Sequence, residues 1–156
     1  MKLGSTFIAL VAVQAAHSVE EYIGRLYDVF PPARFVSGLI STDLRRGFVI
    51  FNVVLVLFGV WCYLWPIRKR WPSATVVGWF WVTIELINGI GHPLWSLREH
   101  AYTPGIATAP LLLALAISLA WQLWFSQASP KPWLQQSHGS AQPRDARWGR
   151  QMRQKC

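Results

Sequence analysis

The sequence predicts an all-α membrane protein whose four transmembrane helices form one bundle. The chain of 156 residues is 53% hydrophobic and only 14% charged, which is about half the charged share of ordinary soluble domains. It also contains four apolar segments, each close to the roughly 20 residues that a helix needs to cross a bilayer. These two observations indicate that the fold has lipid, rather than water, as its main solvent.

The four apolar segments follow one another from the N-terminus to a polar tail. We predict spans at residues 3 to about 23, 48–65, 74 to about 97, and 105–125. Pro66 ends the second segment, and the Pro72-Ser73 pair is a helix-start signal for the third. The first segment resembles a signal peptide, but the polar residues after it fit no cleavage consensus. We therefore expect a retained first helix.

The connection between the first two spans is long enough to contain structure of its own. Residues 33–40 follow two prolines and are amphipathic, so we predict a short interfacial helix in this loop. Such a helix is either a lid over a site or plain interfacial packing, and the sequence leaves both interpretations open. Asp43 and the two hydroxyl residues before it offer N-caps for the second span.

The chain divides into a four-helix transmembrane domain, residues 1–128, and a polar tail, residues 129–156. We expect this tail to be disordered because it is rich in Pro, Gln, Ser and Arg. Ten Lys and Arg residues lie in the N-terminus, the second loop and the tail, and five lie in the other two loops. By the positive-inside rule, both termini are predicted to be cytoplasmic, with a bacterial inner membrane as the default location.

The net charge of +8 does not indicate a nucleic-acid-binding protein. The basic residues lie between and after the apolar segments, where membrane topology explains them, and form no basic face on a soluble fold. The two cysteines provide neither a disulfide framework nor a cysteine-based metal site. We therefore expect membrane lipid and a small apolar substrate as partners, and no nucleic acid. The oligomeric state does not follow from the sequence.

Ionisable side chains inside a span are costly and therefore mark candidate functional sites. In the first span, His17, Glu20 and Glu21 are spaced i, i+3 and i+4, which places all three on one face of the helix. They fall in the last third of that span. The sequence therefore predicts a polar site in the non-cytoplasmic half of the membrane.

A second set of polar residues lies in the third span. Glu85, Asn88 and His92 share one helical face, and this span runs in the same direction as the first. Because a helix rises 1.5 Å per residue, both sets are expected at overlapping depths, where Asn52 of the second span also lies. The Tyr102 hydroxyl, in the turn that precedes the fourth span, is expected on the same outer side.

Imidazole and carboxylate groups without thiolates suit a divalent transition metal such as iron, manganese or zinc. Helical bundles use the same groups at i, i+3 spacing to build carboxylate-bridged metal sites. The candidate metal ligands are His17, Glu20, Glu21, Glu85 and His92. The candidate catalytic residues are Glu20, Glu21, Glu85, Asn88 and Tyr102. Two alternatives stay open: metal-free acid–base catalysis by a desolvated carboxyl group, and polar groups that only hold the helices together.

These motifs resemble those of the HXXEE domain family of small integral membrane proteins. His17 to Glu21 matches its H-x-x-E-E signature, and Glu85 to His92 is similar to its E-x-x-N-x-x-x-H motif. Tyr102 to Gly105 is similar to its Y-x-P-G motif, and the three occur in the family's order. The resemblance implies that the seven candidate residues form one site, with a metal as the expected cofactor. It brings no substrate with it.

The leading hypothesis is a metal-dependent membrane enzyme that acts on a lipid- or isoprenoid-like substrate entering from the bilayer. Oxidation, hydrolysis and isomerisation all fit this hypothesis. A proton or metal-ion transporter is the first alternative, although residues 76–80 in the inner half of the third span offer no polar path. An accessory subunit of a larger membrane complex is the second alternative, in which the polar face would be an interface.

Overall fold

The computed structural model describes residues 2–128, and this part of the chain contains only helical elements and their connections. The long helices are α1 (Leu3–Ile23), α4 (Leu44–Cys62), α5 (Ala74–Glu99) and α6 (Ala109–Ala128). The short elements are α2 (Leu26–Val29), α3 (Pro31–Ile40) and the π-helical turn η1 (Tyr63–Ile67). The predicted tail, residues 129–156, lies outside the described residues.

Four helices are long and apolar enough to cross a membrane, which confirms the predicted all-α architecture of a multi-pass membrane protein. Large apolar side chains point outward along these helices, among them Leu57, Ile87 and Trp121, with exposed fractions of 62%, 66% and 67%. In water such a surface would drive aggregation, whereas lipid tails solvate it. The apolar outer surface is therefore suited to lipid and not to water.

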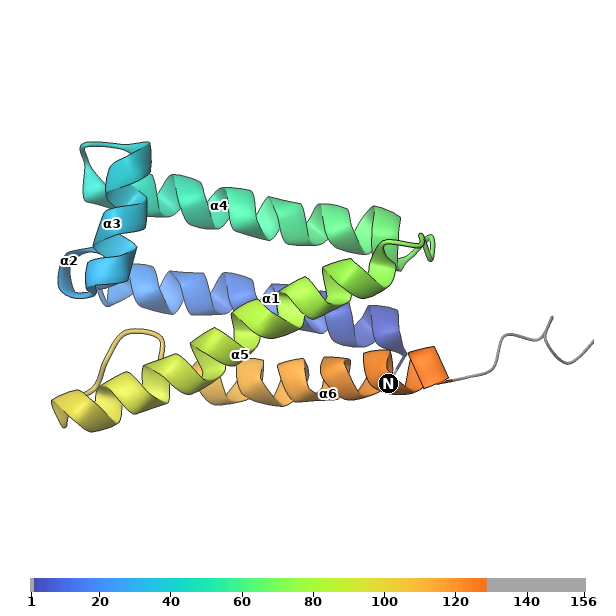
Figure 1. Cartoon of the computed structure of the whole chain (residues 1–156). Helices are drawn as coiled ribbons and strands as arrows, with labels where there is room; N and C mark the ends of the chain where they lie inside the picture. The colour runs from blue at the N-terminus through green and yellow to red at the C-terminus, as the bar shows by residue number, and fades with distance from the viewer. Residues whose placement is uncertain (1, 129–156) are drawn as a thin grey trace, which may run out of the picture. The chain divides into compact units, whose positions relative to one another are not determined.

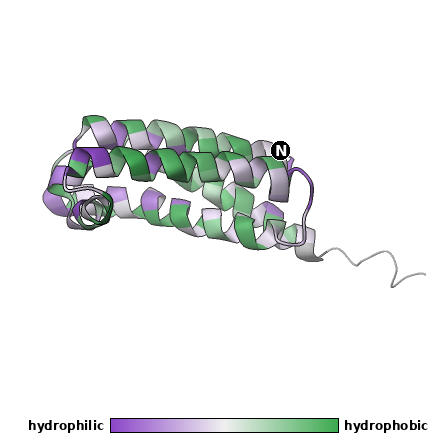
Figure 2. Ribbon diagram, turned by 90° about the horizontal axis from the view of Figure 1, so that it is seen from above, coloured by the Kyte–Doolittle hydropathy of each residue, from purple (hydrophilic) through white to green (hydrophobic). Residues whose placement is uncertain are grey.

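The long helices run alongside one another, and the first connection caps one end (Figure 1). The N-terminal end of α1 and the turn η1 lie at the opposite end from α2 and α3 (Figure 1). Hydrophilic residues appear on the helices toward the end that carries α2 and α3, and also in the loop at the opposite end (Figure 2). The last turns of α1 lie at the end that carries α2 and α3 (Figure 1).

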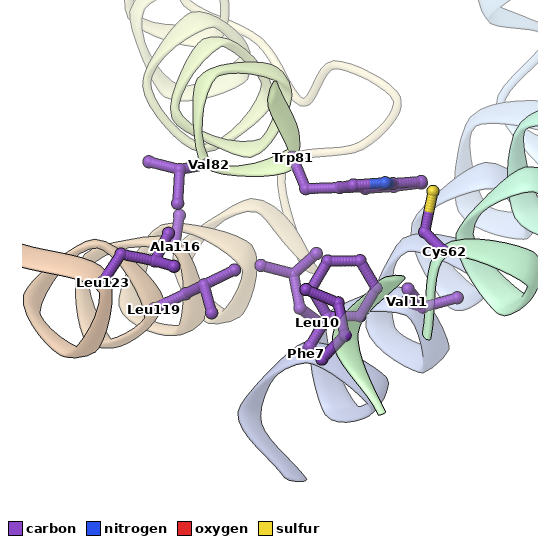
Figure 3. Close-up of a cluster of buried hydrophobic side chains, with 10 residues drawn as sticks. Phe7, Leu10, Val11, Cys62, Trp81, Val82, Ala116, Leu119 and Leu123 are labelled. Carbon is purple, nitrogen blue, oxygen red and sulfur yellow. The ribbon is translucent and has the colours of Figure 1, made fainter. Parts of the chain in front are cut away.

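The apolar core lies nearer the other end and joins all four long helices. Figure 3 shows Trp81 of α5 facing Cys62 and Phe7, with Leu119 of α6 beside them. Small residues let the backbones approach: a Cβ built on Gly59 would lie 2.9 Å from the Trp81 ring. Close packing of this kind replaces the hydrophobic driving force, which is absent between helices in lipid.

The starts of two helices differ from the sequence-based prediction, and Pro66, which was predicted to end the second span, lies inside η1. The second span begins at Leu44, because the Asp43 side chain accepts a hydrogen bond from the Arg46 amide and caps the helix. The fourth span begins at Ala109 rather than at Gly105, because residues 102–108 form a loop. That loop is held by a side chain of α1, as described below.

A helix is present where the interfacial helix was predicted, and α3 runs from Pro31 to Ile40. It packs on α4 at a contact so close that a Cβ on Gly47 would overlap the Ser37 carbonyl. On its other side, Phe35 and Leu39 are about 70% exposed, at 68% and 71%. The helix is therefore amphipathic, with one face on the bundle and one apolar face turned outward.

Candidate metal centre

His17, Glu21 and His92 come together in the interior, between α1 and α5. Nε2 of His17 lies 3.3 Å from Oε1 of Glu21, and Nε2 of His92 lies 3.2 Å from the same oxygen. The two imidazole rings meet edge to face with centroids 4.8 Å apart. All three side chains are buried, and the three atoms that can bind a metal lie within 4.8 Å of one another.

Glu20, the neighbour of Glu21, points instead toward the loop before α6. Its Oε1 accepts hydrogen bonds from the Tyr102 hydroxyl (2.6 Å) and from the amides of Gly105 (3.1 Å) and Ala107 (2.9 Å). Its Oε2 accepts from the Thr108 amide (3.0 Å) and hydroxyl (2.6 Å). Five donors thus converge on one carboxylate, which fixes the loop and satisfies amides at the start of α6.

The same loop covers the two imidazoles. Gly105 has φ of 94°, a conformation that favours glycine, and a Cβ there would lie 2.6 Å from the His92 ring and 2.8 Å from the His17 ring. At the end of α1, a Cβ on Gly24 would lie 2.5 Å from Pro104. Glycine is therefore required both where the loop docks on α1 and where it closes over the histidines.

Thr108 contacts both Glu20 and His17. We call Glu20 with the five hydrogen bonds that it accepts the Glu20 clamp. Its hydroxyl oxygen lies 2.6 Å from Oε2 of Glu20 and 2.6 Å from Nδ1 of His17. A hydroxyl has one hydrogen to donate, and a carboxylate has none. The Thr108 hydrogen therefore goes to Glu20, and the hydrogen between Thr108 and His17 belongs to Nδ1. This places a hydrogen on Nδ1, so a neutral His17 offers the lone pair of Nε2.

The lone pair on His17 Nε2 faces Oε1 of Glu21, which is also an acceptor. The nitrogen is fully buried, and no donor within residues 2–128 satisfies it. Two acceptors at 3.3 Å repel each other unless a proton or a metal ion lies between them. Ligands about 2.1 Å from a common tetrahedral ion lie about 3.4 Å apart, so both nitrogen–oxygen distances suit a metal. The donor set therefore fits a divalent transition metal.

A second polar cluster lies deeper in the bundle and contains Glu85. Glu85 is fully buried, and Nδ2 of Asn88 lies 3.4 Å from its Oε2 and 3.4 Å from Oε1 of Gln14. Gln14 lies one turn before Ser18, whose hydroxyl donates to Asn52 over 2.7 Å. The cluster thus links α1, α4 and α5 at the depth where the sequence predicted polar groups.

A cavity of about 320 Å³ lies against both clusters. Its polar wall contains Glu21 and His92 of the first cluster and Asn88 of the second. The remaining wall is mostly apolar and comes from α3, α4 and α5. Its members include Phe30, Ala33, Val36, Phe51, Leu55 and Ile87. A mostly apolar cavity with a few convergent polar groups has the character of a small-molecule site.

The structure divides the predicted site residues among three places. It brings His17, Glu21 and His92 into one group with metal-binding geometry. Glu20 and Tyr102 bind each other in the loop, while Glu85 and Asn88 belong to the deeper cluster. The seven residues thus occupy one end of the bundle, but they do not form a single ligand set.

Sequence reasoning missed three residues that the geometry makes prominent. Thr108 positions His17 from 91 residues away, and no periodicity in the sequence links them. Gln14 lies one turn before Ser18 on the same face as His17 and Glu21, so helical spacing could have pointed to it. Ser18 occupies an x position of the H-x-x-E-E motif, so the motif itself does not point to it.

Comparison with known proteins is informative at the level of the family. A family model described as "protein of unknown function with HXXEE motif" matches residues 8–121. The chain therefore belongs to this family, and His17 to Glu21 is the H-x-x-E-E motif that the description names. No curated protein matches the chain, and no solved structure matches it.

Proposed function

We propose that this member of the HXXEE family is a metal-dependent membrane enzyme acting on an apolar, lipid-like substrate. The observation that carries the proposal is the position of His17 Nε2, which lies 3.3 Å from a Glu21 oxygen in a fully buried position. The second imidazole, His92, is directed at the same oxygen, which favours a metal over a single shared proton. Iron, manganese and zinc all suit two imidazoles and one carboxylate.

Each side chain has a distinct part in this proposal. A divalent ion held by His17, Glu21 and His92 would supply Lewis-acid chemistry, which can polarise a substrate oxygen or activate water. Glu21 provides the negative charge that offsets the ion, and His17 and His92 provide neutral nitrogen donors. Glu20 and Thr108 hold His17 in the tautomer that offers Nε2. Asn88, on the cavity wall, is available to orient the polar part of a substrate.

The lining of the cavity supports the choice of an apolar substrate. Phe51 of α4 and Ile87 of α5 line it, and their exposed fractions of 41% and 66% support an opening of the cavity between these two helices. An apolar chain can therefore pass between these two helices from the lipid without crossing water. Helix α3 covers the cavity through Ala33 and Val36, which is the position of a lid.

The location of the site follows from the orientation of the helices. The candidate metal centre lies at the end of α1 that is opposite to the N-terminus. If the basic tail and the Arg68-Lys69-Arg70 loop are cytoplasmic, the centre lies in the non-cytoplasmic half of the bilayer. Substrate would then be drawn from the non-cytoplasmic leaflet.

Lipid turnover in a defined membrane tests the proposal. The purified chain is placed in nanodiscs made from a bacterial lipid extract, supplied with iron, manganese or zinc, with oxygen and water available. The lipids are then compared by mass spectrometry with those from Glu21→Gln. We expect a mass change that requires both the metal and Glu21, and that survives in the control Glu99→Gln, an exposed carboxylate at the end of α5. Identical lipid profiles for the wild type and Glu21→Gln under all three metals would contradict the proposal.

A further inference from the structure

A narrow apolar groove runs along the outside of the bundle between α1 and α4. Its volume is about 290 Å³, and its walls include Val19 of α1 together with Val49, Val53 and Leu57 of α4. All four of these side chains are exposed, so the groove opens to the surroundings of the bundle. In a membrane those surroundings are lipid tails.

Two polar side chains line the groove, and both have partners inside the bundle. Ser18 donates to Asn52 over 2.7 Å, and Asn52 donates to the Phe48 carbonyl over 3.0 Å. Both side chains are buried, so the surface of the groove is almost entirely apolar. Such a surface favours a hydrocarbon chain over a polar ligand.

The groove has about the length of one lipid leaflet. Its α4 wall extends from Phe48 to Leu57, which is about 14 Å at 1.5 Å per residue. The hydrocarbon core of a bilayer is about 30 Å thick, so the chains of one leaflet span about half of that distance. Phe48 lies one turn from the start of α4, so the groove runs from this end of the helix toward the middle of the bundle.

A wider recess of about 660 Å³ adjoins the groove, and Tyr22 lines both spaces. Arg45 of α4 also lines this recess. Its Nε donates to the Tyr22 hydroxyl over 2.6 Å, and its guanidinium carbon lies 5.2 Å from the centre of the Tyr22 ring. Tyr22 therefore holds the Arg45 cation at the end of the apolar groove. A guanidinium group has five N–H donors, and this bond uses one of them.

The recess is lined by two arginines and two aspartates, of which only one pair is closed. Arg25 lies 2.8 Å from the Asp28 carboxylate. Asp43 accepts the Arg46 amide through one oxygen, and neither Asp43 nor Arg45 forms an ion pair within residues 2–128. One cation and one anion of the recess thus remain for a ligand, and charge complementarity favours a ligand that carries both signs.

We propose that the groove and the recess together bind one phospholipid whose headgroup contains a phosphate and a primary ammonium. An acyl chain lies in the groove, the phosphate accepts hydrogen bonds from Arg45, and the ammonium donates to Asp43. The lipid fills the space between α1 and α4 and stabilises their packing.

The lipid site is separate from the candidate metal centre. Neither the groove nor the recess is lined by His17, Glu21 or His92. The cavity beside the metal centre lies against another face of α4, at Phe51 and Leu55. The inference therefore goes beyond the proposed function and does not rest on it.

Thermal unfolding of the delipidated full-length chain in detergent tests this inference. Phosphatidylethanolamine, phosphatidylglycerol and diacylglycerol with identical acyl chains are added separately, and native mass spectrometry counts the bound lipids. A ligand that binds only the folded chain raises the unfolding temperature. We expect one phosphatidylethanolamine per chain and a larger rise than with the other two lipids. Equal rises for all three lipids, or a larger rise with phosphatidylglycerol, would overturn the inference.

Variants of the recess test the two headgroup contacts. Arg45→Gln should weaken phosphatidylethanolamine binding on the order of 10-fold, because a hydrogen bond to a charged group is lost. Arg34→Gln, which changes an exposed arginine of α3, should leave the affinity unchanged. Asp43→Asn keeps an oxygen that can cap α4 but removes the charge, so the preference over phosphatidylglycerol should disappear. Unchanged affinity in Arg45→Gln or unchanged preference in Asp43→Asn would contradict the assigned contacts.

A variant of the groove tests the position of the acyl chain. Val53→Trp places an indole ring in the wall of the groove and should reduce phosphatidylethanolamine binding, although the headgroup contacts remain. Val76→Trp is the matched control, because Val76 is an exposed valine of α5 that lines neither the groove nor the recess. Equal phosphatidylethanolamine affinities of the two variants would show that the acyl chain does not lie in the groove.

Discussion

The Thr108 hydroxyl lies 2.6 Å from Nδ1 of His17, although 91 positions separate the two residues in the sequence. The Thr108 hydroxyl donates to Glu20, and its contact with Nδ1 places a hydrogen on that nitrogen of His17. Glu20 therefore acts on the candidate metal centre through Thr108. The outer partners of metal-binding histidines often act in this way. The loop before α6 is therefore part of the site, and its contacts lead to the first predictions.

Replacing Thr108 should weaken metal binding without removing a ligand. In Thr108→Val the methyl group cannot accept from Nδ1, so His17 loses the interaction that directs its Nε2 lone pair to Glu21. We expect metal affinity to fall by about 10–100-fold. Thr108→Ser keeps the hydroxyl and should restore the wild-type affinity. Metal titrations give the affinities, and 15N NMR of labelled histidine reports the tautomer. Equal affinities and an unchanged tautomer in Thr108→Val would show that the contact does not position His17.

The contact of Gly105 with the two rings predicts a strong effect of one methyl group. Gly105→Ala combines a φ of 94° with a Cβ only 2.6 Å from the His92 ring, so the loop or the imidazoles must move. We expect a loss of metal binding and a destabilisation on the order of 1–3 kcal/mol from backbone strain. Gly91→Ala is the matched control, because a Cβ there meets nothing within 4 Å. Similar behaviour of the two variants in metal titration and thermal unfolding would contradict the close packing of Gly105 on the two histidines.

The five hydrogen bonds to Glu20 predict that this residue stabilises the fold. Glu20→Gln removes the charge and presents an NH2 group to donors that need an acceptor. We expect a destabilisation on the order of 2 kcal/mol, which is typical when hydrogen bonds to a charged group are lost. Unfolding in detergent with increasing denaturant measures the change. Glu99→Gln changes an exposed carboxylate and should leave the unfolding midpoint unchanged. An equally small effect of Glu20→Gln would show that the hydrogen bonds to Glu20 do not stabilise the fold.

Tyr102 predicts a change of stability at alkaline pH. The hydrogen bond to the Glu20 carboxylate, followed by desolvation, raises the pKa of the Tyr102 phenol above its ordinary value. Because the folded-state pKa is the higher one, this stabilisation is fully present below about pH 10 and is lost as pH rises through the folded-state pKa. We expect the unfolding temperature to fall more steeply in this range for the wild type than for Tyr102→Phe. The side chain is largely exposed, so the difference is small, and parallel curves would contradict the bond.

Much of the fold could be predicted from the sequence because the bilayer imposes a length on every span. Leu3–Ile23 agrees with the predicted first helix, and α5 begins at the predicted Ala74. The start of α6 could not be predicted, because it depends on Glu20, a tertiary partner that satisfies the amides of the preceding loop. Local propensity predicts a helix start near Pro104 and Gly105. The hydrogen bonds of the loop amides to Glu20 accompany a later start, at Ala109.

The candidate site could be predicted as a set of residues but not as an arrangement. Helical spacing put His17, Glu20 and Glu21 on one face, yet adjacent carboxylates of a helix can point to different neighbours. Glu20 accepts hydrogen bonds from the loop before α6, whereas Glu21 lies beside His17 of α1 and His92 of α5. Which neighbour each one meets depends on helix packing, which periodicity does not encode.

Elemental analysis of the detergent-purified chain is the most direct test of the proposed metal centre. The wild type is compared with a His17→Ala/His92→Ala double variant and with His100→Ala, which removes an exposed histidine beyond the end of α5. We predict near-stoichiometric iron, manganese or zinc in the wild type and in His100→Ala, and its loss in the double variant. Folded wild-type protein that contains no metal, and that binds none of the three ions on reconstitution, would contradict the metal centre.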